Sequence, residues 1–487
     1  MLLVPQMNPA RRQPTEAKHC AIVLGILAVA LLLRGPLLDA VPLSHDEFES
    51  LAESASFLDV AAERGNGPLY FAILRAWRIF FGDSAIALRS LSVLFSIASI
   101  AMVWRCSLQL SDDHRVATLA TTLFAVLPNW IWHARDARMY PEWVFFFLVA
   151  VSAGIELVQA PQGRRARYVY FTATVCGLLC HNYMIFYSVG LAAALWLGLS
   201  ANPCVPRPFF WTFVRIHLPI ALVALAAFAR LWFKVVNPQQ YFYFYLSGDW
   251  SGVQYPFIAL ADLVFRTWIF PFDFPECFLV GITVAALAAI SFNILQRAGR
   301  ATAGVMLFCG GFLPWLIITI APIRHYSRLL APTTPILCML LASAFYAANG
   351  TRRAVVAGGI LTLLALSAAQ FPLVYADPER WAEICHSLNT EGRGSQLIFT
   401  NEERLKHIIH GCVGDRFPIR VIDWQSPEPL TVKPLADSVD TTWIVHSTSW
   451  SGDPDRNMVL LLSRSPLHEM FKYEICPVLD LYRFNHR

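Results

Sequence analysis

The chain has 487 residues, of which 56% are hydrophobic and only 15% are charged. Soluble domains have about 25% charged residues, so this composition is typical of a protein with many membrane spans. The net charge of +4 is too small to indicate nucleic-acid binding. The 11 cysteines include no C-x-x-C pair, which argues against a zinc site.

Apolar stretches recur from the N-terminus to residue 372. A membrane-spanning helix needs about 20 mostly apolar residues, and windows of this length predict about eleven spans. A basic region precedes the first one, as in a signal peptide, but no clear cleavage site follows it, so we expect an uncleaved span. The pair at 168–200 is either one long helix or two short ones. The predicted spans are 20–40, 85–108, 116–132, 141–159, 168–182, 184–200, 210–234, 275–296, 301–321, 329–349 and 354–372.

The basic clusters between these spans all fall on one side of the membrane. By the positive-inside rule this side is cytoplasmic, which places the C-terminal tail outside. Three segments put Arg on the outer side instead, and charge in such a position is costly and usually functional. These segments are 43–84, 133–140 and 322–328.

A domain boundary is predicted near residue 373. Charged residues make up 28 of the 115 residues after it but 44 of the 372 before it. We therefore expect an all-α polytopic membrane domain at 1–372 and a small extracytoplasmic α/β domain at 373–487. The tail has strand patterns at 395–400, 418–424, 442–446 and 471–484, and helix patterns at 378–388 and 402–410.

Two adjacent carboxylates, Asp46 and Glu47, follow the first span at the outer rim. Such a pair most often belongs to a helix start, because acids are favoured in the first turn. At a membrane rim, however, a carboxylate can take a proton from a hydroxyl group held near a lipid headgroup. The pair therefore has one structural and one catalytic interpretation.

The segment 133–140, H-A-R-D-A-R-M-Y, carries two arginines three residues apart. On a helix, Arg135 and Arg138 would share a face, and Asp136 could bind a cation or hold one of the arginines. Paired N–H donors of arginine suit a phosphate. The alternative is an interfacial anchor made of aromatic residues and snorkelling arginines.

Two further polar segments lie far apart in the sequence. The segment 324–328 fits the second half of a phosphate pocket, although arginine snorkelling explains it too. The triplet 181–183 either lines the site or satisfies backbone groups at a helix break. The aromatic stretch 241–245 is typical of a loop that lies at the membrane interface or lines a substrate. Their candidate residues are Arg324, His325, Tyr326 and Arg328 in the first, and His181 and Tyr183 in the second.

In this order the features resemble the GT-C integral-membrane glycosyltransferases, in the branch of the aminoarabinose transferases and protein O-mannosyltransferases. The resemblance covers roughly residues 20–400. It departs from the family where Asn66-Gly67 replaces a usual Pro or His, and where His325 stands in place of Arg. The matching motifs are Asp46-Glu47, Gly67-Pro68-Leu69-Tyr70, Gly82-Asp83 with Arg89, Asp136-Ala-Arg138-Met-Tyr140, His181-Asn-Tyr183, His325-Tyr326 through Pro332 and Pro335, and 379–383 at the entry to the outer domain.

The resemblance implies transfer of a sugar, a hexose or a pentose, from a polyprenyl-phosphate donor, with inversion. Asp46 would be the general base and Glu47 a supporting acid. Arg138, Arg324 or Arg328 would stabilise the charge of the leaving lipid phosphate, with a divalent cation held by Asp136 as a further candidate. A divalent ion, Mg²⁺ or Mn²⁺, is the candidate cofactor, with Asp136 and Asp46 as candidate ligands. The implied phosphate- and substrate-binding residues are Arg138, Arg324, Arg328, Tyr70, Tyr140, His181, Tyr183, His325 and Tyr326.

The resemblance also implies a multi-pass protein of the bacterial inner membrane with a periplasmic C-terminal domain. The acceptor could be lipid A or its core sugars, another glycolipid, or a protein. A transporter or flippase of lipid-linked sugars is the main alternative, although we find no internal repeat of the kind common in transporters. An oligosaccharide ligase or polymerase is closer, and a scaffold would leave the rim charges unexplained. Two of Cys385, Cys412 and Cys476 could pair outside the cytoplasm.

Overall fold

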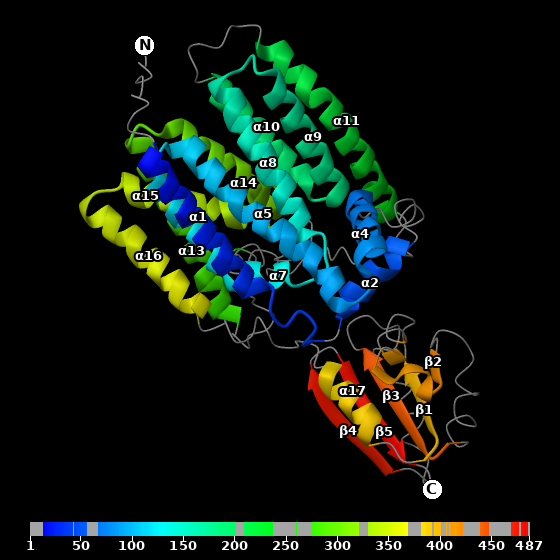
Figure 1. The fold of residues 1–487 in the computed structure, drawn as a ribbon. Helices are drawn as coiled ribbons and strands as arrows, with labels where there is room; N and C mark the ends of the chain where they lie inside the picture. Colours follow the sequence, from blue (N-terminus) through cyan, green and yellow to red (C-terminus); the bar gives the residue numbers. More distant parts are fainter. Residues whose placement is uncertain are drawn as a thin grey trace. The chain divides into compact units, whose positions relative to one another are not determined.

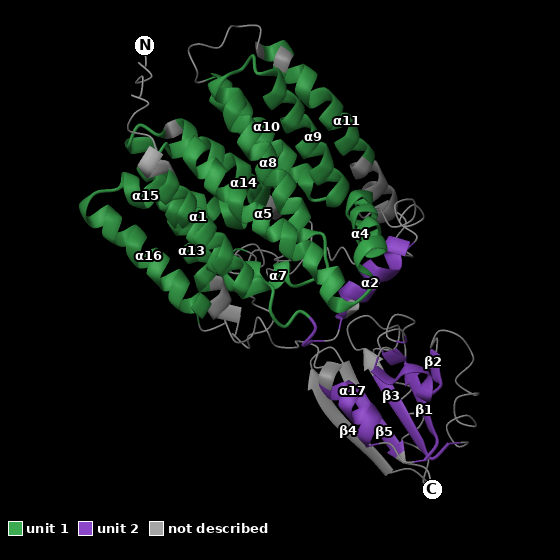
Figure 2. Ribbon diagram, in the orientation of Figure 1, with its two compact units in different colours: residues 1–38, 56–374 green, residues 39–55, 375–487 purple. Residues whose placement is uncertain are grey.

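The computed structural model is mostly helical, with one small sheet near the C-terminus (Figure 1). It divides into two compact units, residues 1–38 with 56–374 and residues 39–55 with 375–487 (Figure 2). The segment 39–55 thus belongs to the second unit, whereas the sequence placed it with the membrane domain. The structure describes residues 13–41, 43–55, 67–200, 209–236, 260, 274–320, 330–368, 381–391, 394–400, 406, 409–410, 412–421, 439–447, 469–476 and 479–485.

The first unit is a helical bundle. In it, α5 packs against α6 and α8, α8 packs against α9, and α10 packs against α14. Its helices are α1 (Gln13–Arg34), α4 (Pro68–Phe81), α5 (Ala85–Ser111), α6 (His114–Val126), α7 (Pro128–Ala134), α8 (Tyr140–Gln159), α9 (Arg164–Cys180), α10 (Met184–Ser200), α11 (Phe209–Val236), α13 (Phe274–Arg297), α14 (Ala301–Ile320), α15 (Thr333–Ala347) and α16 (Gly350–Ala368).

Each predicted span contains a helix, but one of them, 116–132, contains two. The predicted span 116–132 is broken into α6 and α7, because Pro128 starts a new helix and Leu127 before it is extended. The stretch 168–200 is two helices, α9 and α10, separated at 181–183. Among the described residues, 5 helices are long and apolar enough to cross a membrane, namely those at 17–34, 85–111, 140–159, 279–297 and 350–368. The total of about eleven spans stays a prediction.

A fully buried arginine at the end of α1 holds three helices together. The Arg34 guanidinium donates to Ser96 Oγ on α5 at 3.0 Å and to the Ala125 carbonyl on α6 at 2.9 Å. It also donates to the carbonyl of Ala30 in its own helix. Because a buried charge is costly unless it is hydrogen-bonded, these contacts fix the end of α1 within the bundle.

The second unit contains a five-stranded mixed sheet in the order β2-β1-β3-β5-β4. β1 pairs in parallel with β2 and β3, while β5 is antiparallel to β3 and β4. The predicted single strand at 471–484 is wrong: it forms a hairpin of β4 and β5, and Pro477 lies between them. The predicted helix at 402–410 falls mostly outside the described residues. The elements are α2 (His45–Ala55), α17 (Trp381–Thr390), β1 (Gln396–Thr400), the short 3₁₀ helix η4 (Gly414–Arg416), β2 (Ile419–Val421), β3 (Thr441–Ser447), β4 (Glu469–Cys476) and β5 (Leu479–Asn485).

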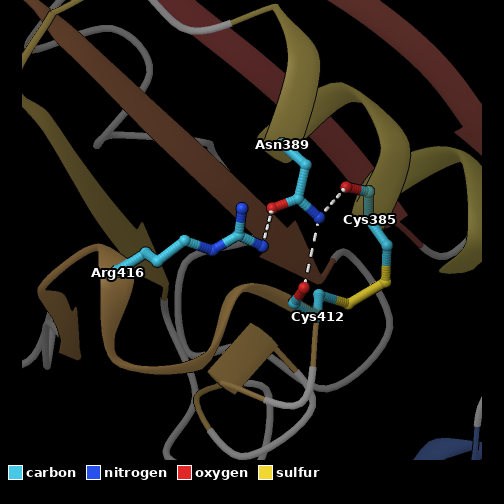
Figure 3. Close-up of a disulfide and its surroundings, with 4 residues drawn as sticks. All are labelled: Cys385, Asn389, Cys412 and Arg416. Atoms are coloured by element: carbon cyan, nitrogen blue, oxygen red, sulfur yellow. Dashed lines mark hydrogen bonds between the residues drawn. A yellow bond between two sulfur atoms is a disulfide. The ribbon is translucent and has the colours of Figure 1, made fainter.

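A disulfide joins Cys385 on α17 to Cys412 (Figure 3). Asn389 reinforces this link, because its Nδ2 donates to the carbonyls of Cys385 and Cys412 at 2.7 and 3.1 Å. Arg416 donates in turn to Asn389 Oδ1 at 2.6 Å. Spacing left open which of the outer cysteines pair, and the structure selects Cys385 with Cys412.

Candidate active site

The two predicted catalytic acids start α2, and Glu47 also caps that helix. The Ser44 backbone N–H donates to Glu47 Oε2 at 2.8 Å, and the Glu47 N–H donates to Ser44 Oγ at 3.3 Å. This reciprocal pair is a capping box. Glu47 is only 1% exposed, whereas Asp46 is half-buried. Glu47 therefore stabilises the start of α2. The catalytic roles of both acids stay predictions.

The rest of α2 has a polar buried face that the sequence analysis missed. Ser50 and Ser54 follow Glu47 at helical spacing, and Glu53 lies beside them; all are buried. The spacing i, i+3 and i+7 is the signal that could have revealed this face. The Ser50 hydroxyl donates to the Asp46 carbonyl, so the first two turns of the helix are tied together.

The predicted phosphate-binding segment at 133–140 is a turn and not a continuous helix. α7 ends at Ala134 and α8 begins at Tyr140. The expectation that Arg135 and Arg138 share a helix face is therefore wrong. The Arg135 guanidinium donates to the carbonyls of Arg34, Pro36 and Leu37, which lie at and after the end of α1. The last carbonyls of a helix have no partner within it, so Arg135 stabilises the C-terminal end of α1 and the loop after it.

The other half of this turn holds two buried charged residues, Asp136 and Arg138. Asp136 and Arg138 are each 6% exposed, and the Arg138 N–H donates to the Asp136 carbonyl at 2.8 Å. The hydroxyl of Tyr70 on α4 donates to the Ala137 carbonyl at 2.6 Å, and Ser92 on α5 donates to the Arg138 carbonyl at 3.4 Å. Two neighbouring helices thus hold the backbone of the turn. Three predicted site residues, Tyr70, Asp136 and Arg138, meet here.

An aromatic cluster continues from this turn. The rings of Trp143 and His181 stack at 4.2 Å, and Tyr140 lies 5.8 Å from His181 between ring centroids. Tyr183, which lies in the same helix break as His181, has its ring centroid 5.7 Å from that of His181. His181 Nδ1 accepts a hydrogen bond from the Tyr183 N–H, which assigns the ring proton of the neutral imidazole to Nε2. The structure therefore brings Tyr140, His181 and Tyr183 together.

Gly67, one of the departures from the family pattern, lies against the end of α9. A Cβ atom at Gly67 would lie 2.2 Å from backbone atoms of Cys180 and Leu179. A larger residue cannot fit without moving the backbone, so glycine is required here. Gly67 also places Pro68 at the start of α4, the helix that carries Tyr70.

The motif Gly82-Asp83 with Arg89 organises the connection from α4 to α5. Asp83 pairs with Arg78 at 2.6 Å, and this hydrogen bond lowers the pKa of the Asp83 carboxyl below its usual value. Arg89 is buried, and its guanidinium donates to the Leu38 carbonyl. The ion pair of Arg78 and Asp83 therefore fixes the loop between α4 and α5, and Arg89 fixes the loop after α1.

A buried acid that the sequence analysis missed lies at the start of α8. Glu142 is 0% exposed, and within the described residues neither carboxylate oxygen has a hydrogen-bond partner. Its position in the first helical turn favours an acid, but a buried polar group without a partner needs a further explanation. A single acid inside an apolar stretch was the available sequence signal.

The remaining predicted residues lie outside the described residues or in the second unit. Arg324, His325, Tyr326 and Arg328, as well as the stretch 241–245, lie outside the described residues. Asp46 and Glu47 belong to the second unit, whereas Asp136 and Arg138 belong to the first. Across the described part of the chain, no group of three His, Cys, Asp or Glu side chains could hold a metal ion. The metal-binding roles of Asp136 and Asp46 therefore stay predictions.

Comparisons with known proteins connect this fold to two glycosyltransferases. No family model and no curated protein sequence matches the chain. Among solved structures, ArnT from Cupriavidus metallidurans in the apo state has a TM-score of 0.52 at 13% identity, over 96% of this chain and 98% of that one. The same protein bound to undecaprenyl phosphate has a TM-score of 0.51 at 14% identity, over 95% and 98%.

The second similar protein is archaeal. The oligosaccharyltransferase AglB from Archaeoglobus fulgidus, in complex with an inhibitory peptide and a dolichol-phosphate, has a TM-score of 0.52 at 11% identity. The match covers 92% of this chain and 71% of that one. The chain thus shares the GT-C fold that its motifs resemble, with a helical part and a smaller mixed-sheet part.

Proposed function

We propose that the chain is an integral-membrane glycosyltransferase that takes its sugar from a polyprenyl-phosphate donor. The observation that carries this proposal is the fold, which matches ArnT along 95% of this chain in the structure bound to undecaprenyl phosphate. AglB, similar over 92% of this chain, is described with a dolichol-phosphate. Both lipids present a phosphate on a long polyprenyl chain.

In this proposal the acceptor is a hydroxyl group outside the cytoplasm, on a glycolipid or a protein. Asp46 takes the proton from that hydroxyl as its oxygen attacks the anomeric carbon from the side opposite the phosphate. The bond from the anomeric carbon to the phosphate oxygen breaks, and the lipid phosphate leaves with the electron pair. The configuration at the anomeric carbon is therefore inverted.

Arg138 is the described residue proposed to stabilise the departing phosphate, with Arg324 or Arg328 as second cations. Fixed donors aimed at developing charge act without reorganising during the reaction. The hydrogen bonds of Tyr70 and Ser92 to the Ala137 and Arg138 carbonyls support this role, because they hold the backbone of Arg138 in place. The cluster of Tyr140, His181 and Tyr183 is proposed to contact the substrate.

We also propose about eleven membrane spans, with the N-terminus inside and the second unit in the periplasm. The disulfide between Cys385 and Cys412 supports this orientation, because disulfides persist in oxidising compartments. In intact cells, an impermeant maleimide should label these two cysteines only after reduction. Cys204, which the predicted spans place in a cytoplasmic loop, should stay unlabelled until the cells are opened. Labelling of Cys204 in intact cells would contradict the orientation.

The activity is tested by following both products. Membranes containing the protein are supplied with a panel of undecaprenyl-phosphate sugars, with and without extracted glycolipids or envelope proteins. Acceptor-dependent release of undecaprenyl phosphate is expected, and Asp46→Asn should slow it by about 10²–10⁴-fold. A transporter would move the lipid without cleaving it. Mass spectra of glycolipids from a deletion strain would then identify the sugar and the acceptor.

A further inference from the structure

Helix α2, which carries Asp46 in its first turn, belongs to the second unit together with the C-terminal domain. Phe48 on α2 packs against the hydrophobic core of the second unit. That core joins the sheet to α17, and Cys412 of the disulfide packs against it as well. Its fully buried members are Ile384, Leu388, Ile398, Ile409, Val413, Trp443, Val445 and Leu481.

Phe48 is the largest apolar side chain of α2. The helix has 11 residues, H-D-E-F-E-S-L-A-E-S-A, and Leu51 is its only other large apolar residue. An isolated helix shorter than about 12–15 residues is marginal in water, so such a helix depends on tertiary packing. The capping box at Ser44 and Glu47 fixes where α2 begins, and the packing of Phe48 fixes which domain it belongs to.

We propose that Phe48 is a positioning residue that couples the C-terminal domain to the predicted base. This inference rests on the proposed function. Asp46 and Phe48 are two residues apart in one helix, about 3 Å along its axis, so a shift of Phe48 moves Asp46. Misplacing a catalytic group by about 1 Å can cost roughly 10²-fold in rate. The C-terminal domain thereby acts as the support that holds the base in place.

The chain offers a matched control for this idea. Phe417 is the same residue type, is also half-buried and packs against the same core, but it follows η4 instead of lying on α2. Phe48→Ala and Phe417→Ala should therefore weaken the core of the second unit similarly. Only Phe48→Ala should release α2. Phe48→Leu keeps an apolar side chain at the anchor and should restore most of the function.

Two measurements on the full-length protein in membranes separate the alternatives. The first is kcat and KM for release of undecaprenyl phosphate. Phe48→Ala should lower kcat by about 10- to 100-fold and change KM for the donor little, because the donor contacts do not involve α2 in this scheme. The second is hydrogen–deuterium exchange of the peptide covering 43–55. Exchange should rise in Phe48→Ala and stay near the wild-type rate in Phe417→Ala.

The proposal is overturned if Phe417→Ala lowers kcat as much as Phe48→Ala, since the effect would then be loss of domain stability. It is also overturned if Phe48→Ala keeps the wild-type kcat, or if its exchange at 43–55 is unchanged. If the wild type itself cleaves no lipid-linked sugar, the proposed function fails. The exchange comparison then still decides whether Phe48 anchors α2.

Discussion

The neighbouring acids Asp46 and Glu47 provide a matched pair of substitutions. Each is replaced by its amide, which keeps the shape and removes the negative charge and the ability to accept a proton. A general base contributes about 10²–10⁴ in rate, which is about 2.7–5.5 kcal/mol in activation free energy. Asp46→Asn is expected to lower kcat by this factor, because the proposed proton acceptor is lost.

Glu47→Gln should have a much smaller effect because of the geometry of the capping box. Glu47 Oε2 accepts from the Ser44 N–H at 2.8 Å, and a glutamine carbonyl oxygen can accept the same bond, as in other capping boxes. A hydrogen bond to a charged group stabilises a protein by about 1.5–3 kcal/mol, and a neutral one by about 0.5–1.5. The expected loss is therefore about 1 kcal/mol in folding stability, with kcat within about tenfold of wild type.

The assay is a single-turnover reaction in membranes with donor in excess over its binding constant, followed by the release of undecaprenyl phosphate. Thermal unfolding in detergent checks that each variant is folded. Full transfer by both variants would refute a catalytic role for this pair of acids. A loss in Glu47→Gln as large as that in Asp46→Asn would refute the assignment of the base to Asp46.

Three further predictions concern the surroundings of the site, and thermal unfolding in detergent measures all of them. Tyr70→Phe leaves a buried carbonyl without its 2.6 Å donor and should destabilise by about 1–3 kcal/mol. Gly67→Ala puts a Cβ 2.2 Å from backbone atoms and should destabilise by about 1–3 kcal/mol or more, whereas Gly25→Ala, with nothing within 4 Å, should stabilise by about 0.5–1 kcal/mol. Asp83→Asn removes an exposed, solvent-screened ion pair with Arg78 and should cost at most about 1 kcal/mol. Folding lowers the pKa of Asp83, so the wild type should be more stable than Asp83→Asn at pH values above the usual carboxyl pKa. This difference in the free energy of unfolding is lost as the pH falls through the lowered pKa.

The helices were predictable because an apolar run of membrane length is a strong signal. Their interruptions were harder to place. Pro128 breaks the predicted span 116–132. This break could have been predicted locally, because a proline disfavours the helical conformation of the residue before it. The predicted strand 471–484 is two antiparallel strands, β4 and β5, and a proline in the sequence of a strand pattern, here Pro477, argues against one continuous strand. Both errors came from giving hydrophobicity more weight than proline.

The site was predictable as a set of segments but not as a set of contacts. The order of the motifs indicated which segments matter, and the structure brings Tyr70 to the turn of Asp136 and Arg138. The capping box of Ser44 and Glu47 could have been predicted from spacing alone. The carbonyl partners of Arg135 could not, because they lie about 100 residues away in the sequence.

Two buried or half-buried arginines of the first unit have contacts that a charge rule alone cannot predict. Arg135 and Arg89 donate to backbone carbonyls of the segment 34–38, so their charges stabilise the end of α1 and the loop after it. The backbone of Arg138 is held by Ser92 on α5, whose hydroxyl donates to the Arg138 carbonyl. Replacing Arg135 should act through folding, whereas replacing Arg138 tests the proposed phosphate-binding role. In that proposal an Arg138→Lys variant folds normally but loses transfer, because lysine lacks the paired donors of arginine.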